Sequence, residues 1–99
     1  MPRTPIHPGE ILADELAELG ISGAELARTL RVPANRISQI IAGKRAITAD
    51  TALRIGKWLG TGPELWLNLQ KTFELDQARA GIGKKLDAIP SVRKARRAA

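Results

Sequence analysis

The sequence predicts an all-helical fold built from five helices. Leucine and alanine, which favour helices, number twelve and fifteen among the 99 residues, whereas aromatic residues, which suit strands, make up only 3%. Apolar residues recur at helical spacing in five segments, and glycine or proline separates each segment from the next. A chain of this length organises one hydrophobic core, so we expect a single domain over residues 7–79.

The first helix is predicted to begin at Pro8 and to end before Gly20. Proline at the first helical position has its φ angle preset, and glycine accepts the left-handed conformation that closes many helices. The only histidine, His7, precedes this helix, where a lone imidazole is more typical of a cap than of a catalytic group. The inward-facing stripe consists of Ile11, Leu12, Leu16 and Leu19.

The second helix begins at a capping box. Ser22 and Glu25 form the S-x-x-E pattern, which satisfies two backbone amides at a helix start, and the helix is predicted to run through Leu30. Arg31 follows at a position where a turn between two such helices commonly has glycine. Either the turn differs, or arginine adopts a left-handed conformation at a cost of about 1–2 kcal/mol.

The third helix is opened by Pro33 and closed by Gly43, and its core face and polar face lie on opposite sides. At about 100° per residue the isoleucines gather on one side and the polar residues on the other. The isoleucines are Ile37, Ile40 and Ile41, and the polar residues are Asn35, Ser38 and Gln39. The pattern over residues 22–43 therefore predicts a helix-turn-helix motif in which the third helix is the recognition helix. Such a motif predicts DNA binding.

Four residues of the recognition helix are predicted to contact bases. The amides of Asn35 and Gln39 can pair bidentately with adenine edges in the major groove. Ser38 borders the same face, and Arg36 on its flank can either read guanine or hold a phosphate. Ala34, at the helix start, can touch a thymine methyl group.

Three further residues are predicted to contact phosphates. Lys44 and Arg45 follow the glycine that closes the recognition helix, where the chain turns back along the groove wall. Contacts of this kind position a protein on DNA without reading its sequence. Ser22, at the start of the second helix, is either a phosphate ligand or simply a cap.

The fourth helix can be capped by Thr48 and stops at Gly60, and the fifth starts at Pro63 and runs to about residue 78 or 79. The fifth helix carries large apolar residues on more than one face, so it is either deeply buried or half of a subunit interface. We expect a dimer interface at Trp66, Leu69 and Phe73.

The charges and the two ends of the chain complete this organisation. Residues 1–6 form an N-terminal arm, and residues 80–99 form an extension that is expected to be flexible and that ends in a basic tail. The net charge is +6, with seven basic against two acidic residues in 21–60 and six against one in 83–99. This distribution favours a polyanionic partner.

Composition also argues against several functions. The chain has no cysteine, and a single histidine supplies no set of metal ligands, so neither a metal nor another cofactor is expected. No apolar run approaches the roughly 18 residues of a membrane-spanning helix, and no signal-peptide core is present. We expect a cytoplasmic protein that is associated with the nucleoid when bound to DNA and has no membrane partner.

About residues 6–79 resemble the HigA-type antitoxins, a branch of the lambda-repressor-like (XRE) helix-turn-helix family. The resemblance rests on His-Pro-Gly-Glu-Ile-Leu at 7–12, Gly-Lys-Arg-Ala-Ile-Thr at 43–48 and Trp-Leu-Asn-Leu-Gln at 66–70. The chain departs mildly at 73–75, where it has Phe-Glu-Leu and the family often has Tyr-Asp-Leu.

This resemblance implies a five-helix lambda-repressor-like DNA-binding domain without enzymatic activity, to which the sequence adds a short basic C-terminal tail. It further implies a homodimer that binds a palindromic operator, represses its own operon and neutralises an mRNA-cleaving toxin of the HigB type. The family's base-contacting positions correspond to Asn35, Arg36, Ser38 and Gln39. Dimerisation is expected on physical grounds too, because one helix reads only a few base pairs and two half-sites restore specificity.

Three alternatives remain open from the sequence. A stand-alone repressor of the phage or metabolic type would have the same DNA chemistry without a toxin. A small cationic ribonuclease would use His7 against a phosphodiester, although that imidazole has no evident base partner. A packaging module would bind all nucleic acid sequences equally.

Overall fold

The computed structural model describes residues 4–93. Five α-helices and one short 3-10 helix make up this part of the chain, and residues 4–93 contain no strand. The helices are α1 (Pro8–Leu19), α2 (Gly23–Leu30), α3 (Ala34–Ile41), α4 (Ala49–Leu59), α5 (Pro63–Ile82) and the 3-10 helix η1 (Gly83–Lys85). The predicted all-helical class with five α-helices is confirmed.

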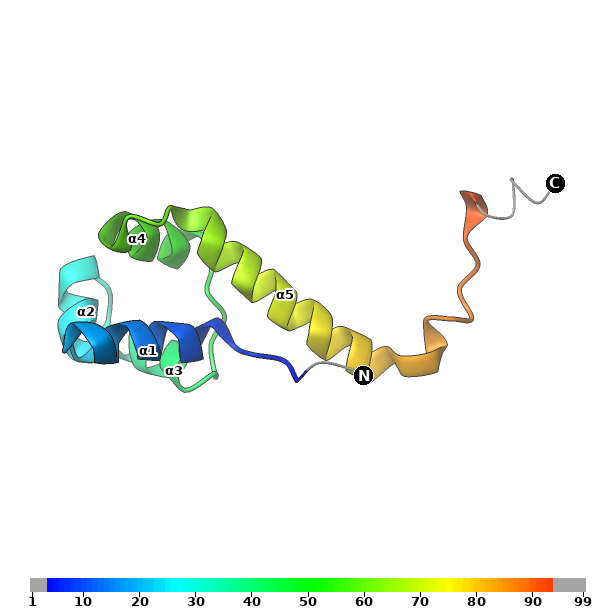
Figure 1. The fold of residues 1–99 in the computed structure, drawn as a ribbon, viewed down its shortest axis with the longest axis horizontal. Helices are drawn as coiled ribbons and strands as arrows, with labels where there is room; N and C mark the ends of the chain where they lie inside the picture. Colours follow the sequence, from blue (N-terminus) through cyan, green and yellow to red (C-terminus); the bar gives the residue numbers. More distant parts are fainter. Residues whose placement is uncertain (1–3, 94–99) are drawn as a thin grey trace.

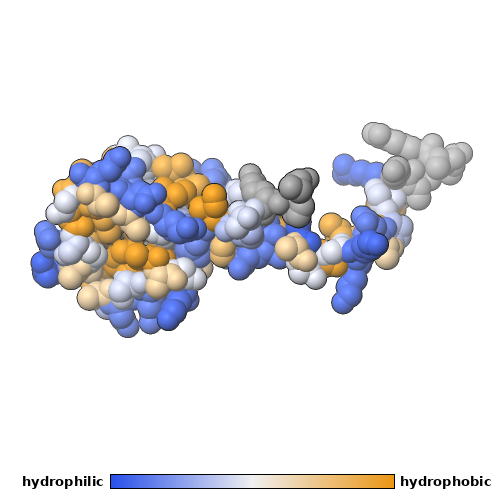
Figure 2. Space-filling view, turned by 60° about the horizontal axis from the view of Figure 1, so that its bottom comes forward, coloured by the Kyte–Doolittle hydropathy of each residue, from blue (hydrophilic) through white to orange (hydrophobic). Residues whose placement is uncertain are grey.

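The arrangement is a globular body with a projecting end. Figure 1 shows α1 to α4 gathered at one end of the molecule, with the first part of α5 packed against them and its last turns extending away. Residues 83–93 extend farther from the globular body, and the space-filling view in Figure 2 shows both hydrophilic and hydrophobic residues along this projecting part. The principal extents are 59 × 22 × 22 Å.

The fifth helix is longer than the sequence predicted. It spans 20 residues and ends at Ile82 rather than near Arg79, so the first residues of the predicted extension are helical. Gly81 lies inside the helix. An internal glycine lowers helix stability by only about 1 kcal/mol relative to alanine, so it need not end a helix. The helix ends at Gly83, whose φ of 54° is left-handed and whose N–H donates to the Arg79 carbonyl. Residues 94–99 of the predicted basic tail lie outside the described residues.

The start of α1 is built as the sequence predicted. The Nδ1 atom of His7 accepts a hydrogen bond from the Gly9 N–H at 2.9 Å, and the Glu10 carboxylate accepts one from the His7 N–H at 3.3 Å. His7 is therefore a helix cap. Thr48 occupies the corresponding position of α4, but its hydroxyl makes no capping hydrogen bond.

The core receives residues from all five helices. α1 packs on α3 and α5, α2 packs on α3, and α4 packs on α5. Because α3 lies between α1 and α2, its buried face is fixed from two sides. The buried apolar residues are Leu12, Leu16, Leu26, Ala27, Leu30, Ile37, Ile40, Ile47, Ala52, Ile55 and Trp66.

Two helix contacts are too close for a side chain. A Cβ atom at Gly9 would lie 1.8 Å from the carbonyl oxygen of Ile40, so the start of α1 rests directly on the backbone of α3. A Cβ atom at Gly56 would lie 2.4 Å from the carbonyl carbon of Gly62, in the turn before α5. Glycine at these two positions thus sets how α1 lies on α3 and how α4 meets α5.

A buried amide joins α5 to the loop after α3. Gln70 is buried, and its Oε1 atom accepts a hydrogen bond from the Ile47 N–H at 2.8 Å. Its Nε2 atom donates to Glu74 at 3.2 Å. The loop that follows the recognition helix is therefore anchored on α5. Within residues 4–93, none of the helices is long and apolar enough to cross a bilayer.

Candidate nucleic-acid interface

The third helix presents its polar side chains to solvent. Ile37 and Ile40 are fully buried, whereas Asn35 and Ser38 are exposed and Gln39 is half-buried. The Ser38 hydroxyl donates to the Asn35 carbonyl at 3.3 Å, so its oxygen stays near the helix surface. The predicted division into a core face and a polar face is therefore present, and the two amides are accessible to a ligand from outside.

The turn between α2 and α3 depends on a left-handed arginine. Arg31 has φ 61° and ψ 47°, and it is the only non-glycine residue with positive φ in the described part of the chain. Its N–H donates to the Arg28 carbonyl at 3.2 Å, and the next residue, Val32, donates to the Ala27 carbonyl at 3.0 Å. Of the two possibilities left by the sequence, the structure has the strained arginine, which orients α3 relative to α2.

Ser22 is engaged in the predicted capping box. Its hydroxyl oxygen accepts a hydrogen bond from the Glu25 N–H at 3.1 Å, and the Glu25 carboxylate accepts from the Ser22 N–H at 3.3 Å. The carboxylate also lies 3.2 Å from the Ser22 hydroxyl. The amides of Ser22 and Glu25 therefore already have partners within the chain.

Lys44 and Arg45 extend the surface beyond the end of α3. Both side chains are exposed, and Gly43 before them has φ 74°. The Lys44 N–H donates to the Gln39 carbonyl at 2.8 Å, so this segment turns directly out of the recognition helix. The Gln70 bond to Ile47 fixes the other end of the same loop.

An ion-pair cluster lies beside the recognition helix. The Asp50 carboxylate accepts hydrogen bonds from Arg36 at 2.7 Å and from the Nε atom of Arg54 at 3.0 Å. A second nitrogen of Arg54 donates to the Leu30 carbonyl at 2.7 Å. The cluster thus connects α2, α3 and α4, and it places the predicted base-contacting Arg36 in contact with a carboxylate.

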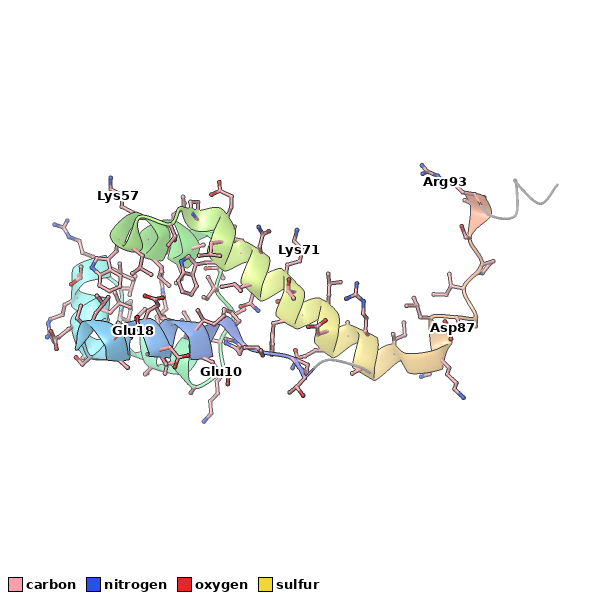
Figure 3. All side chains as sticks on the ribbon, viewed as in Figure 1. Glu10, Glu18, Lys57, Lys71, Asp87 and Arg93 are labelled. Carbon is pink, nitrogen blue, oxygen red and sulfur yellow. The ribbon has the colours of Figure 1, made fainter. Side chains whose placement is uncertain are left out.

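The electrostatics of this cluster keep the carboxylate charged. The hydrogen bond from Arg54 is the largest influence, and with the bond from Arg36 and the charges of both guanidinium groups it holds the pKa of Asp50 below its usual value. Loss of solvent around the carboxylate opposes that shift. Figure 3 shows Lys57 and Lys71 pointing away from α1 and α3.

The three residues predicted for a dimer interface have different environments. Trp66 is 1% exposed and belongs to the core, so in a single chain it has almost no surface to offer a partner. Leu69 and Phe73 are half-buried, and the Phe73 ring meets the His7 ring edge-on with centroids 4.8 Å apart. Leu69 lines an apolar groove of about 270 Å³, together with Ile6, Ile11 and Leu65.

Two residues that shape this surface were not identified from the sequence. Asp50 has the ordinary position of an acid in the first turn of a helix, and no pattern in the sequence indicates its partner 14 residues earlier. Gln70 lies in a helix that has several other polar residues, among them Asn68 and Lys71, so its polarity alone did not mark it; the available signal was its position one helical turn after Trp66. Within residues 4–93, no three His, Cys, Asp or Glu side chains are grouped closely enough to hold a metal ion.

Residues 12–66, more than half of the chain, match a family model described as helix-turn-helix. Virulence-associated protein I of Dichelobacter nodosus is 46% identical over 74 residues, which cover 74% of this chain and 68% of that protein.

Solved structures are similar over most of the chain. An addiction module antidote protein of the HigA family from Coxiella burnetii has a TM-score of 0.87 at 49% identity, covering 90% of this chain and 98% of that one. The antitoxin HigA of Pseudomonas aeruginosa, solved with the higBA promoter, has a TM-score of 0.85 at 43% identity, with the same coverage. The family match over residues 12–66 includes α2, α3 and the loop after α3.

Proposed function

This chain belongs to the helix-turn-helix family, in the XRE-type branch that includes the HigA antitoxins, and we propose that it binds the operator of its own operon as a dimer and represses transcription. Members of this family are DNA-binding proteins and not enzymes. The His7 imidazole, which would serve a ribonuclease, is engaged in capping α1.

The observation that carries the proposal is the exposure of Asn35 and Ser38 on a helix whose other face buries Ile37 and Ile40 completely. In this reading α3 enters the major groove, where Asn35 and Gln39 pair with adenine edges and Ser38 and Arg36 contact neighbouring bases. Each bidentate contact supplies about 1–3 kcal/mol of discrimination. Lys44 and Arg45 contact the phosphates beside the groove and hold α3 in register.

A dimer forms, in this proposal, along the apolar groove that Ile6 and Ile11 line together with Leu65 and Leu69 of α5. Leu65 and Ile6 are 44% and 56% exposed there, and Leu69 both lines the groove and packs against the core. A second copy would cover these side chains and remove apolar surface from water. Trp66 then supports the interface from inside the core, and Phe73 supports it through its contact with His7. Two recognition helices of a dimer fit half-sites about 34–36 Å apart, which accounts for a palindromic operator.

The partner proposed for the repressor is a small mRNA-cleaving toxin of the HigB type, encoded beside it and neutralised by binding. Similarity to HigA antitoxins supports this step. Binding to a chromosomal operator assigns the working protein to the cytoplasm. Co-expression of the chain with the product of the adjacent reading frame should yield a complex that co-purifies and restores growth. Operator binding without any such complex would instead indicate a stand-alone repressor.

DNA recognition is tested by replacing Asn35 and Gln39 together by alanine. The double variant should lose its preference for the operator over a scrambled duplex and keep weak, salt-sensitive binding, because phosphate contacts remain. Gln77→Ala, which removes an exposed amide from α5, is the matched control and should keep the preference. An operator preference that survives in the double variant would contradict the assignment of these amides.

A further inference from the structure

We propose that Asp50 is a positioning residue that fixes the guanidinium of Arg36 for base recognition, so that it lowers general affinity for DNA and raises discrimination between sequences. This inference rests on the proposed DNA-binding function and names a further residue that determines its specificity.

The geometry of the cluster gives Asp50 control of Arg36. One nitrogen of Arg36 donates to Asp50 at 2.7 Å, which uses one of the five N–H donors of the guanidinium. The other donors stay available, and a guanidinium fork held by one edge presents the rest in a fixed plane. Bidentate pairing with the O6 and N7 atoms of guanine requires a fixed plane of this kind, whereas a phosphate contact tolerates many orientations.

Asp50 is itself held in place from a second direction. Arg54, one turn further along α4, donates its Nε atom to the same carboxylate oxygen at 3.0 Å and another nitrogen to the Leu30 carbonyl at 2.7 Å. Leu30 is the last residue of α2, so Arg54 braces the carboxylate on α4 against the end of α2. A carboxylate braced in this way can act as a fixed support for a side chain on the recognition helix.

The exposure of the cluster points to a role in binding rather than in folding. The side chains of Arg36, Asp50 and Arg54 are 29%, 56% and 40% exposed. Ion pairs in water at this exposure contribute little to stability. An exposed carboxylate beside a DNA-reading helix also repels phosphates, which weakens binding to every sequence alike.

The same carboxylate lies next to the segment proposed to contact phosphates. Arg36, Arg45, Thr48, Asp50 and Arg54 line one open hollow of about 350 Å³. Without Asp50, the guanidinium of Arg36 could turn into this hollow and contact a phosphate together with Arg45. Asp50 therefore selects between the two roles that the sequence left open for Arg36.

The test compares two duplexes at several salt concentrations, namely an operator selected from random sequence by the wild-type protein and a scrambled duplex of the same composition. Asp50→Ala should bind the scrambled duplex more tightly, with a salt slope steeper by about 0.9 for each phosphate gained. Discrimination should fall about tenfold, within the range expected for one bidentate base contact. Asp50→Asn, which keeps an oxygen acceptor for both arginines, should lie between wild type and Asp50→Ala.

Coupling to Arg36 separates this mechanism from a general charge effect. In an Arg36→Ala background, Asp50→Ala should cause no further loss of discrimination. Glu18→Ala removes an exposed carboxylate from α1, labelled in Figure 3, and should leave discrimination unchanged. Circular dichroism and thermal unfolding verify that each variant is folded. If Asp50→Ala does not fold, the same comparison is made with Asp50→Asn.

The inference is overturned if wild type discriminates between the duplexes and both Asp50 variants do so equally well, or if the loss persists without Arg36. Equal binding of both duplexes by the wild-type protein would overturn the proposed function, and this inference with it.

Discussion

At the scale of single residues, the turn of the motif is formed under strain. Arg31 adopts a left-handed backbone conformation that residues other than glycine rarely adopt. This conformation lets the N–H of Val32 donate to the Ala27 carbonyl at 3.0 Å. The side chain itself is exposed, so nothing in its packing compensates for this conformation. The tight α2–α3 turn is therefore formed at a local conformational cost.

Replacing Arg31 by glycine should raise the free energy of unfolding by about 1 kcal/mol, because glycine adopts this conformation without a clash and the gain exceeds its larger loss of chain entropy. Urea unfolding followed by circular dichroism measures the change. Arg28→Gly is the matched comparison, since Arg28 lies inside α2 with ordinary helical geometry and should lose about 1 kcal/mol. Equal losses in both variants would show that Arg31 is not strained.

The Asp50 carboxyl should titrate below the ordinary aspartate value of about 3.9, because Arg54 and Arg36 stabilise its charged form. Since the folded-state pKa is lowered, the contribution of these pairs to stability is complete above the unfolded-state pKa. It is lost as the pH falls through the folded-state pKa. NMR titration of the side-chain carboxyl measures the midpoint directly.

Single-residue variants test the cause of that shift. Arg54→Ala should raise the Asp50 midpoint more than Arg36→Ala, because the Arg54 hydrogen bond has the larger effect. An unchanged midpoint in both variants would exclude the cluster as the cause.

The residue scale also shows what the sequence could predict. Asn35 and Ser38 could be placed on the solvent face, and Ile37 and Ile40 in the core, because helical periodicity alone decides which residues share a face. The partner of Arg36 could not be predicted, because the cluster joins residues 14 apart that meet only once α3 and α4 are packed. Side-chain contacts between elements depend on that packing, which periodicity does not determine.

At the scale of whole elements, helix starts were more predictable than helix ends. The cap at His7 and the capping box at Ser22 appear as the local sequence indicates, since a cap involves only neighbouring residues. The end of α5 was misplaced, because Gly81 is tolerated within the helix and the left-handed Gly83 ends it. The close approach of α1 to α3 was likewise not evident, as Gly9 also fits an ordinary position early in a helix.

Gly9→Ala should destabilise the fold by about 1–3 kcal/mol or more, the usual cost of overpacking, because its Cβ atom would lie 1.8 Å from the Ile40 carbonyl oxygen. The displaced α3 should also bind the operator more weakly. Gly81→Ala is the control, since nothing lies within 4 Å of its Cβ position, and it should gain about 0.5–1 kcal/mol. Denaturant unfolding and a DNA-binding assay measure the two effects. A Gly9→Ala variant with the stability and operator affinity of the wild type would contradict the prediction.

At the scale of the whole molecule, α5 contributes one face to the core and another to the apolar groove. Its Trp66 and Gln70 face inward, to the core and to the loop after α3, whereas Leu65 lies on the apolar groove. A helix with two apolar faces was expected from the sequence, but assigning Trp66 to one of them required the packing of α4 and α5. The dimer itself remains a prediction.

Leu65→Lys should convert a dimer into a folded monomer, because it introduces charge at a side chain that is 44% exposed in the single chain. Leu67→Lys is the control, since Leu67 is also exposed on α5 but does not line the groove, and the dimer should persist. Trp66→Ala should instead lower the free energy of unfolding by about 3–5 kcal/mol. Sedimentation equilibrium that still gives a dimer for Leu65→Lys would exclude this groove as the interface.

The projecting end of α5 affects the molecular weight that gel filtration assigns to this protein. The radius of gyration is 17.7 Å, whereas a compact chain of about 100 residues has about 13 Å. An elongated particle of this kind experiences more friction than a sphere of equal mass, so a gel-filtration column calibrated with spherical standards would overestimate the molecular weight of one chain. An apparent dimer on such a column can be a single rod-like protomer, and only methods independent of shape distinguish the two.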